Sequence, residues 1–289
     1  MAGHNPTERR ILLERINEID NISDLKWKDG LVDRKRKELE FHDQNRDRER
    51  IEETVSADTY EKYYGNKKYY TITGRSNGYV NGWISKESKG YKVFLDYACG
   101  NGRNAILAAQ AGAGLSLGFD ISPVSVANAK KAAATVGLSD KNIRFFQADA
   151  ENTMLPDNSI DRVVCSGMLH HLDLSYVFPE LRRILKPGGK VLAVEALDYN
   201  PAIKLYRFLT PDMRTDWEKV HILKLSDIGF ASRFFDVTEI RYWHVLGYIA
   251  GKLPALFQLL DRLDRLLEKL PYVQRMAWIF TFILQKRLE

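Results

Sequence analysis

The sequence predicts an α/β fold in which a mostly parallel sheet carries helices on both faces. Short apolar segments alternate with helical segments between residues 91 and 196, and such alternation forms parallel strands with right-handed crossovers. A glycine-rich turn joins the first strand to the first helix, and acidic residues stand at the ends of strands. Open α/β sheets bind ligands at this edge, so we expect a site there.

Five strands and three helices make up this alternating region. The predicted strands are residues 92–97, 115–120, 143–148, 160–166 and 190–195, and the predicted helices are residues 103–111, 125–136 and 177–185. Two later apolar segments, at residues 234–243 and 277–286, predict the last strands and complete a seven-stranded sheet.

The residues before the first strand have a different character. Aliphatic residues between positions 11 and 19 recur at helical spacing, and residues 34–53 alternate basic and acidic side chains, which predicts solvated helix with one thin apolar stripe. Tyrosines and glycines crowd residues 58–83, a pattern typical of a lid or cap rather than a regular element.

These differences predict the domain organisation. We expect an N-terminal helical and Tyr-rich cap over residues 1–88. The rest of the chain, residues 89–289, is expected to form the main domain, with insertions at about 196–232 and 244–276.

Composition narrows the class of protein. The 289 residues include 43 Lys and Arg against 38 Asp and Glu, and the net charge of +5 is spread without a basic stripe, which argues against a nucleic-acid partner. Two cysteines, Cys99 and Cys165, exclude a disulfide framework and a four-cysteine zinc site. We therefore expect no metal and a reducing, cytoplasmic setting. The apolar stretches fall well short of the roughly 20 residues of a spanning helix, so no transmembrane segment is expected.

The strongest functional signal is the strand, turn and helix that begin at residue 93. Gly100 and Gly102 let the backbone turn tightly and approach a ligand without a side chain in the way. The following helix offers free backbone N–H groups at the same place. Carboxylates at strand ends are costly in a buried sheet unless they meet a polar ligand, and three stand there: Asp96, Asp120 and Asp149.

Five segments stand in the order and spacing of a known family: residues 95–102, 118–122, 148–150, 155–161 and 185–190. On these segments the chain resembles the class I S-adenosylmethionine-dependent methyltransferases. The element at residues 169–172 is similar to the subgroup that includes quinone and other small-molecule methyltransferases. The resemblance implies a Rossmann-like sheet with an antiparallel last strand. It also implies S-adenosylmethionine as cofactor and S-adenosylhomocysteine as product.

The resemblance implies roles for single residues. Asp120 would bind the ribose hydroxyls, Asp149 the adenine amino group, and Asp96 would lie near the methionine amino group. The other residues expected to bind the cofactor are Ala98, Gly100, Asn101 and Gly102 in the turn, Ile121 and Ala150 beside adenine, and Ser166 and Gly167 at the sulfonium end.

Direct displacement of the methyl group would require alignment of the reactants and exclusion of water. His170 and His171 follow the fourth strand at the rim of the cleft, where an imidazole can take a proton from a hydroxyl. His42 is a third candidate base, on a helix that would have to cross the cleft. The alternatives are a structural role in the loop for His170 and His171, and exposure on a charged helix for His42.

The acceptor site is expected outside the common core. Tyr64 and Tyr70 would contribute to an aromatic roof, and Tyr206, Arg207 and Trp217 offer polar and cationic groups, with plain packing and surface charge as the alternatives. In the apolar region from residue 243 to 276, a helix carries leucines on one face. We favour a helix pair that covers the sheet. A peripheral membrane contact, an acceptor tunnel and a homodimer interface stay open.

Together these features predict an S-adenosylmethionine-dependent methyltransferase acting on a small-molecule acceptor, at a hydroxyl of a secondary metabolite, sugar or lipid-like compound. The alternatives are C- or N-methylation of a quinone- or isoprenoid-like molecule, a nucleic-acid methyltransferase and a non-catalytic cofactor-binding scaffold. Residues 166–169 lack the proline-rich motif that grips a flipped base. Residues 103–105 lack the third glycine of a dinucleotide-dependent oxidoreductase.

Overall fold

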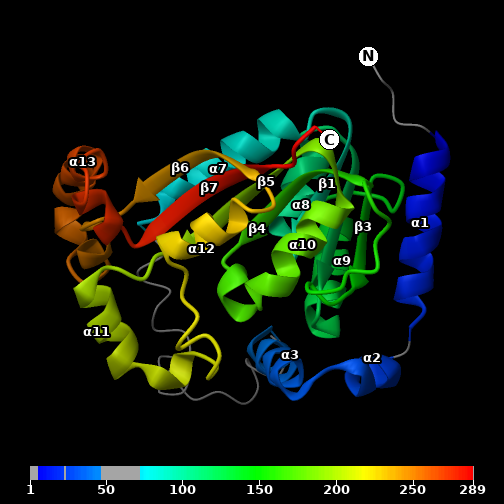
Figure 1. Ribbon diagram of the computed structural model, residues 1–289, viewed down its shortest axis with the longest axis horizontal. Coiled ribbons are helices and arrows are strands. Elements are labelled where there is room, and N and C mark those ends of the chain that lie inside the picture. Colours follow the sequence, from blue (N-terminus) through cyan, green and yellow to red (C-terminus); the bar gives the residue numbers. More distant parts are fainter. Residues whose placement is uncertain (1–5, 23, 47–71, 289) are drawn as a thin grey trace.

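A seven-stranded sheet forms the centre of the computed structural model, which describes residues 6–22, 24–46 and 72–288 (Figure 1). The strand order is β3-β2-β1-β4-β5-β7-β6, and β7 runs antiparallel to its neighbours β5 and β6. This confirms the predicted mostly parallel sheet with an antiparallel last strand. The strands are β1 (Gly90–Tyr97), β2 (Ala113–Asp120), β3 (Ile143–Gln147), β4 (Ile160–Ser166), β5 (Leu185–Ala196), β6 (Asp236–Trp243) and β7 (Ile279–Gln285).

Helices cover both faces of the sheet, as the alternation of strands and helices predicts. One face packs against α7 (Gly74–Glu87), α8 (Arg103–Gln110) and α9 (Pro123–Thr135). The other packs against α1 (Pro6–Asp20), α10 (Leu174–Ile184) and α12 (Leu225–Ala231). Side chains alternate between the faces along each strand, so that Phe94 meets the first group of helices while Val93 and Leu95 meet the second.

Residues 74–83 do not form an irregular lid, so that part of the sequence prediction is wrong. They belong to α7, whose Val80 and Ile84 pack one helical turn apart against Phe94. The glycines that suggested broken structure recur every four residues, and a Cβ on any of them would meet no atom within 4 Å. They therefore lie along open space on the helix and leave its buried stripe intact. The tyrosine-rich residues 47–71 lie outside the described residues.

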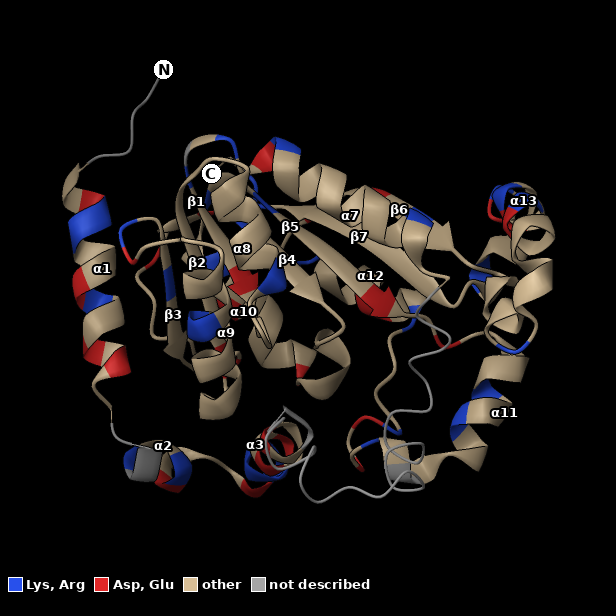
Figure 2. Ribbon diagram, turned by 180° about the vertical axis from the view of Figure 1, so that it is seen from behind, with Lys and Arg blue, Asp and Glu red and all other residues tan. Residues whose placement is uncertain are grey.

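The N-terminal helices differ from one another in what they cover. In α1, Leu12, Ile16 and Ile19 are buried on the sheet, which confirms the thin apolar stripe. Two further helices follow, α2 (Asp24–Gly30) and α3 (Asp33–Arg46), and Figure 2 shows both signs of charge along α3. The expected boundary at residue 88 falls between α7 and β1, and the division into a cap and a main domain stays a prediction.

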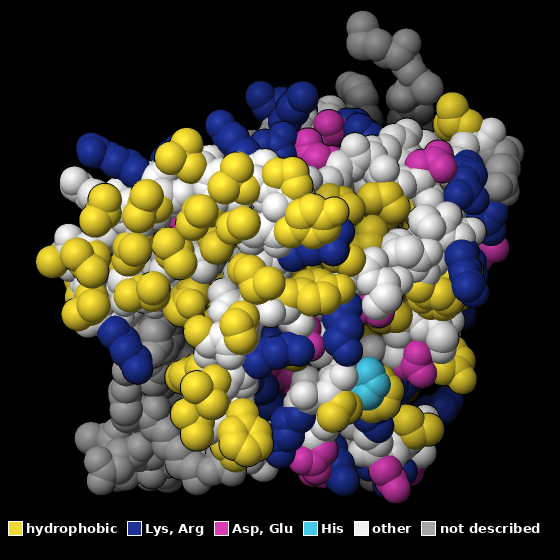
Figure 3. Space-filling model, turned by 60° about the vertical axis from the view of Figure 1, so that its left-hand side comes forward, with side chains coloured by type: hydrophobic (Ala, Val, Ile, Leu, Met, Phe, Trp, Pro, Cys, Tyr) yellow, Lys and Arg dark blue, Asp and Glu magenta, His cyan; other side chains and the backbone are white. Residues whose placement is uncertain are grey.

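The segment between β6 and β7 contains α13 (Phe257–Leu267), which is turned opposite to the prediction. Leu259, Leu263 and Leu266 point into solvent, whereas Asp264 is fully buried. The leucine-rich face therefore does not cover the sheet, and Figure 3 shows apolar side chains gathered on this side of the molecule. Among the described helices, none has the length and apolar character needed to cross a membrane.

Candidate functional site

The glycine turn after β1 is built by its own strained backbone and by a carboxylate from β2. Ala98, Gly100 and Gly102 all have positive φ, and Gly102 leads directly into α8. A Cβ on Gly102 would lie 2.7 Å from the Phe145 ring, so the position requires glycine for space as well as for φ. Asp120 accepts hydrogen bonds from the N–H groups of Gly100 at 2.8 Å and Ser122 at 3.0 Å, which fixes the turn to the end of β2.

A first cavity of about 80 Å³ lies at the carboxyl ends of the strands, where the sequence predicts the site. It brings together many of the predicted residues: Ala98, Asp120, Ile121, Asp149, Ala150, Ser166, Gly167, His42 and His171. Apolar walls from Phe119, Ala148, Met168 and Leu172 face the two carboxylates. We call this space the strand-end cavity.

Four of the predicted cofactor residues do not line the strand-end cavity. Asp96 is buried beneath the turn, where its oxygens accept hydrogen bonds from the Asn104 side chain and the Ala105 N–H, each at 3.2 Å. Burial raises the pKa of Asp96 to about 7, against the opposing effect of these hydrogen bonds. Gly100, Asn101 and Gly102 shape the turn beside the cavity.

Helix α3 covers the strand-end cavity through ion pairs that the sequence analysis missed. Lys35 places its Nζ 2.5 Å from Asp149 Oδ2 and 2.9 Å from Glu151 Oε2, and Arg34 lies 2.5 Å from Glu151 Oε1. Burial alone would lower the pKa of Lys35, but its hydrogen bonds to Asp149 and Glu151 raise the pKa above its usual value. One side of α3 is solvated, as expected, with Arg36, Lys37 and Glu40 exposed, but the sequence does not predict that its other side closes a cavity.

Glu38 of α3 joins three parts of the chain. Its Oε2 accepts a hydrogen bond from His171 Nδ1 at 3.0 Å, and its Oε1 accepts one from the Thr215 hydroxyl at 2.6 Å. His42 lies one turn further along α3, with its Nε2 3.8 Å from Glu38 and its ring 5.0 Å from that of His171. The alternative of an exposed His42 is therefore wrong, since α3 brings this residue to the cavity, and its role as a base stays a prediction.

Glu195, at the carboxyl end of β5, organises the turn that carries the two histidines. It is nearly fully buried, and its Oε1 accepts hydrogen bonds from the N–H groups of Met168 and Leu169, both at 2.8 Å. Its Oε2 accepts a hydrogen bond from His170 Nδ1 at 2.7 Å. Burial alone would lower the pKa of His170, but Glu195, and then Glu218 at 3.8 Å, raise it above the usual value. An acid at the end of a strand was the signal that would have identified Glu195.

A second cavity of about 560 Å³ opens on the other side of His170, and we call it the helix cavity. It lies among α11 (Pro201–Leu209), the following loop and the 3-10 turn Gly247–Gly251. Its lining is mostly apolar and includes His170, Ala202, Ile203, Tyr206, Arg207, Met213, Arg214, Glu218, Ile222, Tyr248, Ile249, Lys252, Leu253 and Trp278.

The structure places some of the predicted acceptor residues at the helix cavity and others away from it. Tyr206 and Arg207 line the helix cavity, and Arg207 Nη1 lies 3.2 Å from Asp198. Trp217 does not line it, because its ring stacks on His221 at 3.6 Å and lies 4.5 Å from the Arg34 guanidinium. Tyr64 and Tyr70 lie outside the described residues.

Some of these side chains also have the chemistry of metal ligands. Within the described ranges, nitrogen and carboxylate oxygen atoms lie within 4.8 Å of one another in three sets: Glu38, His42 and His171; His170, His171 and Glu218; and His244, Asp264 and Glu268. In the first two sets the histidines are also held by the hydrogen bonds described above.

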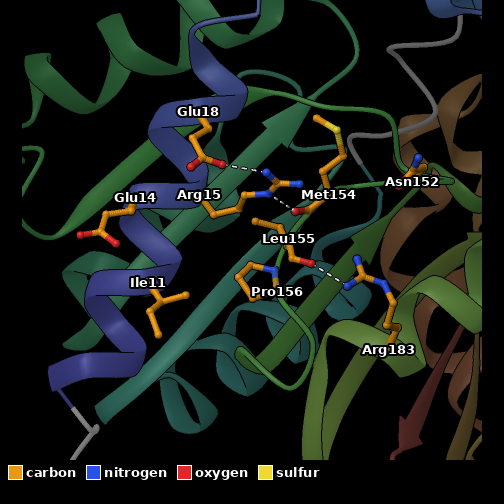
Figure 4. A pocket seen from close by; sticks show the side chains of 9 residues that line it. All are labelled: Ile11, Glu14, Arg15, Glu18, Asn152, Met154, Leu155, Pro156 and Arg183. Carbon is orange, nitrogen blue, oxygen red and sulfur yellow. Dashed lines mark hydrogen bonds and ion pairs between the residues drawn. The ribbon is translucent and has the colours of Figure 1, made fainter.

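A third hollow, of about 550 Å³, runs between α1 and the chain that follows β3 (Figure 4). Arg15 donates to the Met154 carbonyl at 2.9 Å and to Glu18 at 2.7 Å, and Arg183 donates to the Leu155 carbonyl at 2.6 Å. The contact of Arg15 with Met154 attaches α1 to this chain, and that of Arg183 attaches α10 to it. The hollow is therefore the seam along which α1 packs.

Comparisons with known proteins agree with this geometry. Residues 95–193 match the family described as "Methyltransferase domain". A demethylmenaquinone methyltransferase of Thermus thermophilus is 33% identical over 109 residues, which are 37% of this chain and 48% of that protein. The 27-O-demethylrifamycin SV methyltransferase of Amycolatopsis mediterranei is 37% identical over 98 residues, which are 34% of this chain and 36% of that protein.

A solved structure extends the likeness beyond the matched residues. The phosphoethanolamine N-methyltransferase 2 of Haemonchus contortus, in complex with S-adenosylhomocysteine, aligns with a TM-score of 0.54 at 19% identity. The alignment covers 84% of this chain and 60% of that one, and at this identity it shows the shared fold alone. The chain spans less than half the length of the two curated relatives.

Proposed function

We propose that this chain, whose residues 95–193 match a methyltransferase domain, is a class I S-adenosylmethionine-dependent methyltransferase that transfers a methyl group to a small-molecule acceptor. One observation carries the proposal. The strand-end cavity and the helix cavity meet at the adjacent residues His171 and His170, which line one cavity each and whose rings lie 4.3 Å apart. A donor in the first cavity and an acceptor in the second would react at this junction.

The strand-end cavity has the chemistry of an adenosine site. Ile121, Ala150 and Phe119 provide apolar walls for a purine, and the Asp120 and Asp149 carboxylates can accept hydrogen bonds from hydroxyl and amino groups. Its volume of about 80 Å³ is below the roughly 300 Å³ of a small ligand pocket. Entry of the cofactor therefore requires α3 to move away and release Asp149 from Lys35.

S-adenosylmethionine supplies, when bound, a methyl group on a positively charged sulfur. The chain contributes alignment and a base. Glu195 accepts a hydrogen bond from the Nδ1–H group of His170, and in the neutral imidazole this leaves Nε2 without a proton, able to act as a base at the helix cavity. A base held in this way favours a hydroxyl acceptor, and transfer to nitrogen or carbon is the alternative.

Calorimetry with S-adenosylhomocysteine tests the donor site. We expect binding that Asp120→Asn weakens roughly tenfold or more, because a carboxylate that accepts hydrogen bonds contributes more than a neutral amide. The exposed Asp140→Asn is the matched control. Unchanged affinity in Asp120→Asn would refute the donor site. Incubation of a cell extract with labelled methyl donor, followed by mass spectrometry of the labelled product, identifies the acceptor and its methylated atom.

A further inference from the structure

Helix α13 presents an inverted amphipathic face. Leu259, Leu263 and Leu266 are 56%, 39% and 63% exposed, although they are spaced to form one apolar stripe. Its carboxylates point inward instead. Burying charge while exposing leucine raises the free energy of an isolated folded chain, so the orientation of α13 needs an explanation.

Arg75 of α7 holds the inward carboxylates. Its guanidinium lies 2.5 Å from Asp261, pairs with both oxygens of Glu268 at 2.7 Å, and lies 3.9 Å from Asp264. Asp264 also accepts hydrogen bonds from the N–H groups of Leu246 and Gly247 at 2.7 and 3.0 Å. The orientation of α13 is thus fixed by a specific polar network.

The network removes acidic charge from the outer surface. The acids of α13 and of the turn after it are bound to Arg75, whereas Arg262, Lys269 and Arg275 are exposed among the leucines. Figure 3 shows this side of the molecule, with yellow side chains interrupted by dark blue ones. We call it the outer leucine face. Its large exposed apolar residues are Leu253, Leu256, Phe257, Leu259, Leu263, Leu266, Leu270, Tyr272 and Met276, and those of the neighbouring α11 are Leu205, Phe208 and Leu209.

The outer leucine face is continuous with the helix cavity. Lys252 and Leu253 are exposed on this face and also line the cavity, and Ala202 lines it from α11. A molecule leaving the face therefore reaches His170 through a mostly apolar cavity, with Arg207, Arg214 and Glu218 near its inner end.

We infer that the outer leucine face docks on an anionic lipid bilayer and that the helix cavity draws an apolar, lipid-like acceptor from it. The acceptor part rests on the proposed function, whereas the docking part stands on the surface alone. Leucines inserted between headgroups and basic side chains beside anionic lipids are the two components of interfacial binding. Each Lys or Arg near such a surface strengthens binding roughly fivefold.

A bilayer fits this face better than a second copy of the chain. Two copies joined through this face would bring the basic side chains of both, Arg262, Lys269 and Arg275, into one interface, and like charges disfavour association. They would also cover the cavity at Lys252 and Leu253.

Flotation of the full chain with lipid vesicles tests the docking. Wild type is expected to float with vesicles of phosphatidylglycerol and phosphatidylcholine in equal parts, and more weakly with phosphatidylcholine alone. Leu259→Gln combined with Leu263→Gln and Leu266→Gln should reduce partitioning roughly tenfold or more, because the inserted apolar area is lost. Arg262→Gln with Lys269→Gln should remove most of the preference for the anionic vesicles.

The matched control changes three exposed apolar residues elsewhere: Val136, Tyr176 and Leu288 to Gln. This variant should float like wild type, and both triple variants should keep their circular dichroism spectrum and their affinity for S-adenosylhomocysteine. Docking is refuted if wild type stays at the bottom of the gradient, or if the leucine variant floats as the control does. A dimer that forms in sedimentation equilibrium, needs the leucines and does not float would assign the face to a second copy. Failure to bind S-adenosylhomocysteine would refute the donor site without affecting flotation.

A fluorescent fatty acid tests the acceptor class. cis-Parinaric acid has an unbranched apolar chain with a carboxylate at one end, and it becomes fluorescent in dry surroundings, so saturable binding to wild type is expected. Ala202→Phe, which places a ring at the wall of the helix cavity and narrows it, should weaken binding several-fold, while Leu205→Phe, at a residue of α11 that does not line the cavity, should not. Absence of saturable binding, or equal affinity in both variants, would refute the lipid-like acceptor.

Discussion

Replacement of His244 by Asn should alter the pH dependence of stability in one direction, and replacement of Asp264 by Asn should alter it in the other. Both residues belong to the network that orients α13. His244 is buried with φ +65°, a conformation that Asn adopts readily, and its Nε2 lies 3.0 Å from the Ser76 hydroxyl. Burial, and then Arg75, lower the pKa of His244 to about 4, whereas burial raises the pKa of Asp264 to about 6.

The two shifts have opposite signs in the free energy of unfolding. The folded state disfavours protonation of His244. The contribution of neutral His244 to the free energy of unfolding is therefore present above the pKa of the unfolded state and is lost as pH falls towards 4. The loss amounts to about 3 kcal/mol between pH 7 and pH 4. The folded state favours protonation of Asp264, so its contribution is present at low pH and is lost as pH rises through 6, about 2 kcal/mol over the same range. In the wild type the two terms largely cancel.

Urea unfolding at several values between pH 4 and pH 7 measures the effect. Relative to wild type, the free energy of unfolding of His244→Asn should rise by about 3 kcal/mol as pH falls from 7 to 4. That of Asp264→Asn should fall by about 2 kcal/mol over the same range. The exposed Asp140→Asn serves as control for other carboxyl groups. If the free energies of unfolding of wild type and the three variants change with pH in parallel, burial in this network does not shift the pKa of His244 or of Asp264.

Three further outcomes are expected. Lys35→Gln should speed the association of S-adenosylhomocysteine in stopped-flow measurements roughly tenfold, because the ion pair that holds α3 over Asp149 is lost. Lys37→Gln, at an exposed residue of the same helix, should leave the rate unchanged. Glu195→Gln should move the midpoint of the pH–rate profile to lower pH, because the carboxylate that raises the pKa of His170 is gone. His170→Gln should lower kcat by about 10²-fold or more, while the affinity for S-adenosylhomocysteine is retained. Gly102→Ala should destabilise the fold by about 2 kcal/mol in thermal unfolding, because the added Cβ meets Phe145 at 2.7 Å in a backbone with φ +76°, whereas Gly82→Ala, with open space at its Cβ, should stabilise α7.

The sheet and the strand-end cavity could be predicted because their determinants are local. The parallel strands carry short apolar runs closed by turns, and such strands bring their carboxyl ends to one edge of the sheet. Asp120, Asp149 and Gly167 therefore lie where the sequence places them. Asp96 ends its strand too, but its oxygens are bound beneath the turn to Asn104 and Ala105.

The orientation of helices relative to the core could not be predicted in the same way. The periodicity of α13 shows that it has two faces, but the partner of each face depends on Arg75, far away in the sequence. Likewise, nothing local to Lys35 or Glu38 indicates that their partners are Asp149, His171 and Thr215. In α7, the regularly spaced glycines suggested irregular structure, whereas the buried side chains of Val80 and Ile84 are the signal that this segment is a helix packed on the sheet.

The position of Glu38 has a consequence for the kinetic order of the reaction. Its two carboxylate oxygens bind His171, which lines the strand-end cavity, and Thr215, in the loop that contributes Met213 and Arg214 to the helix cavity. On the proposed function, a movement of α3 that admits the donor would therefore also release the acceptor loop, and the return of α3 would hold both. Such a linkage favours a sequential scheme in which the donor enters first and the acceptor binds to the re-closed complex. Product inhibition by S-adenosylhomocysteine would then be competitive with the donor and noncompetitive with the acceptor.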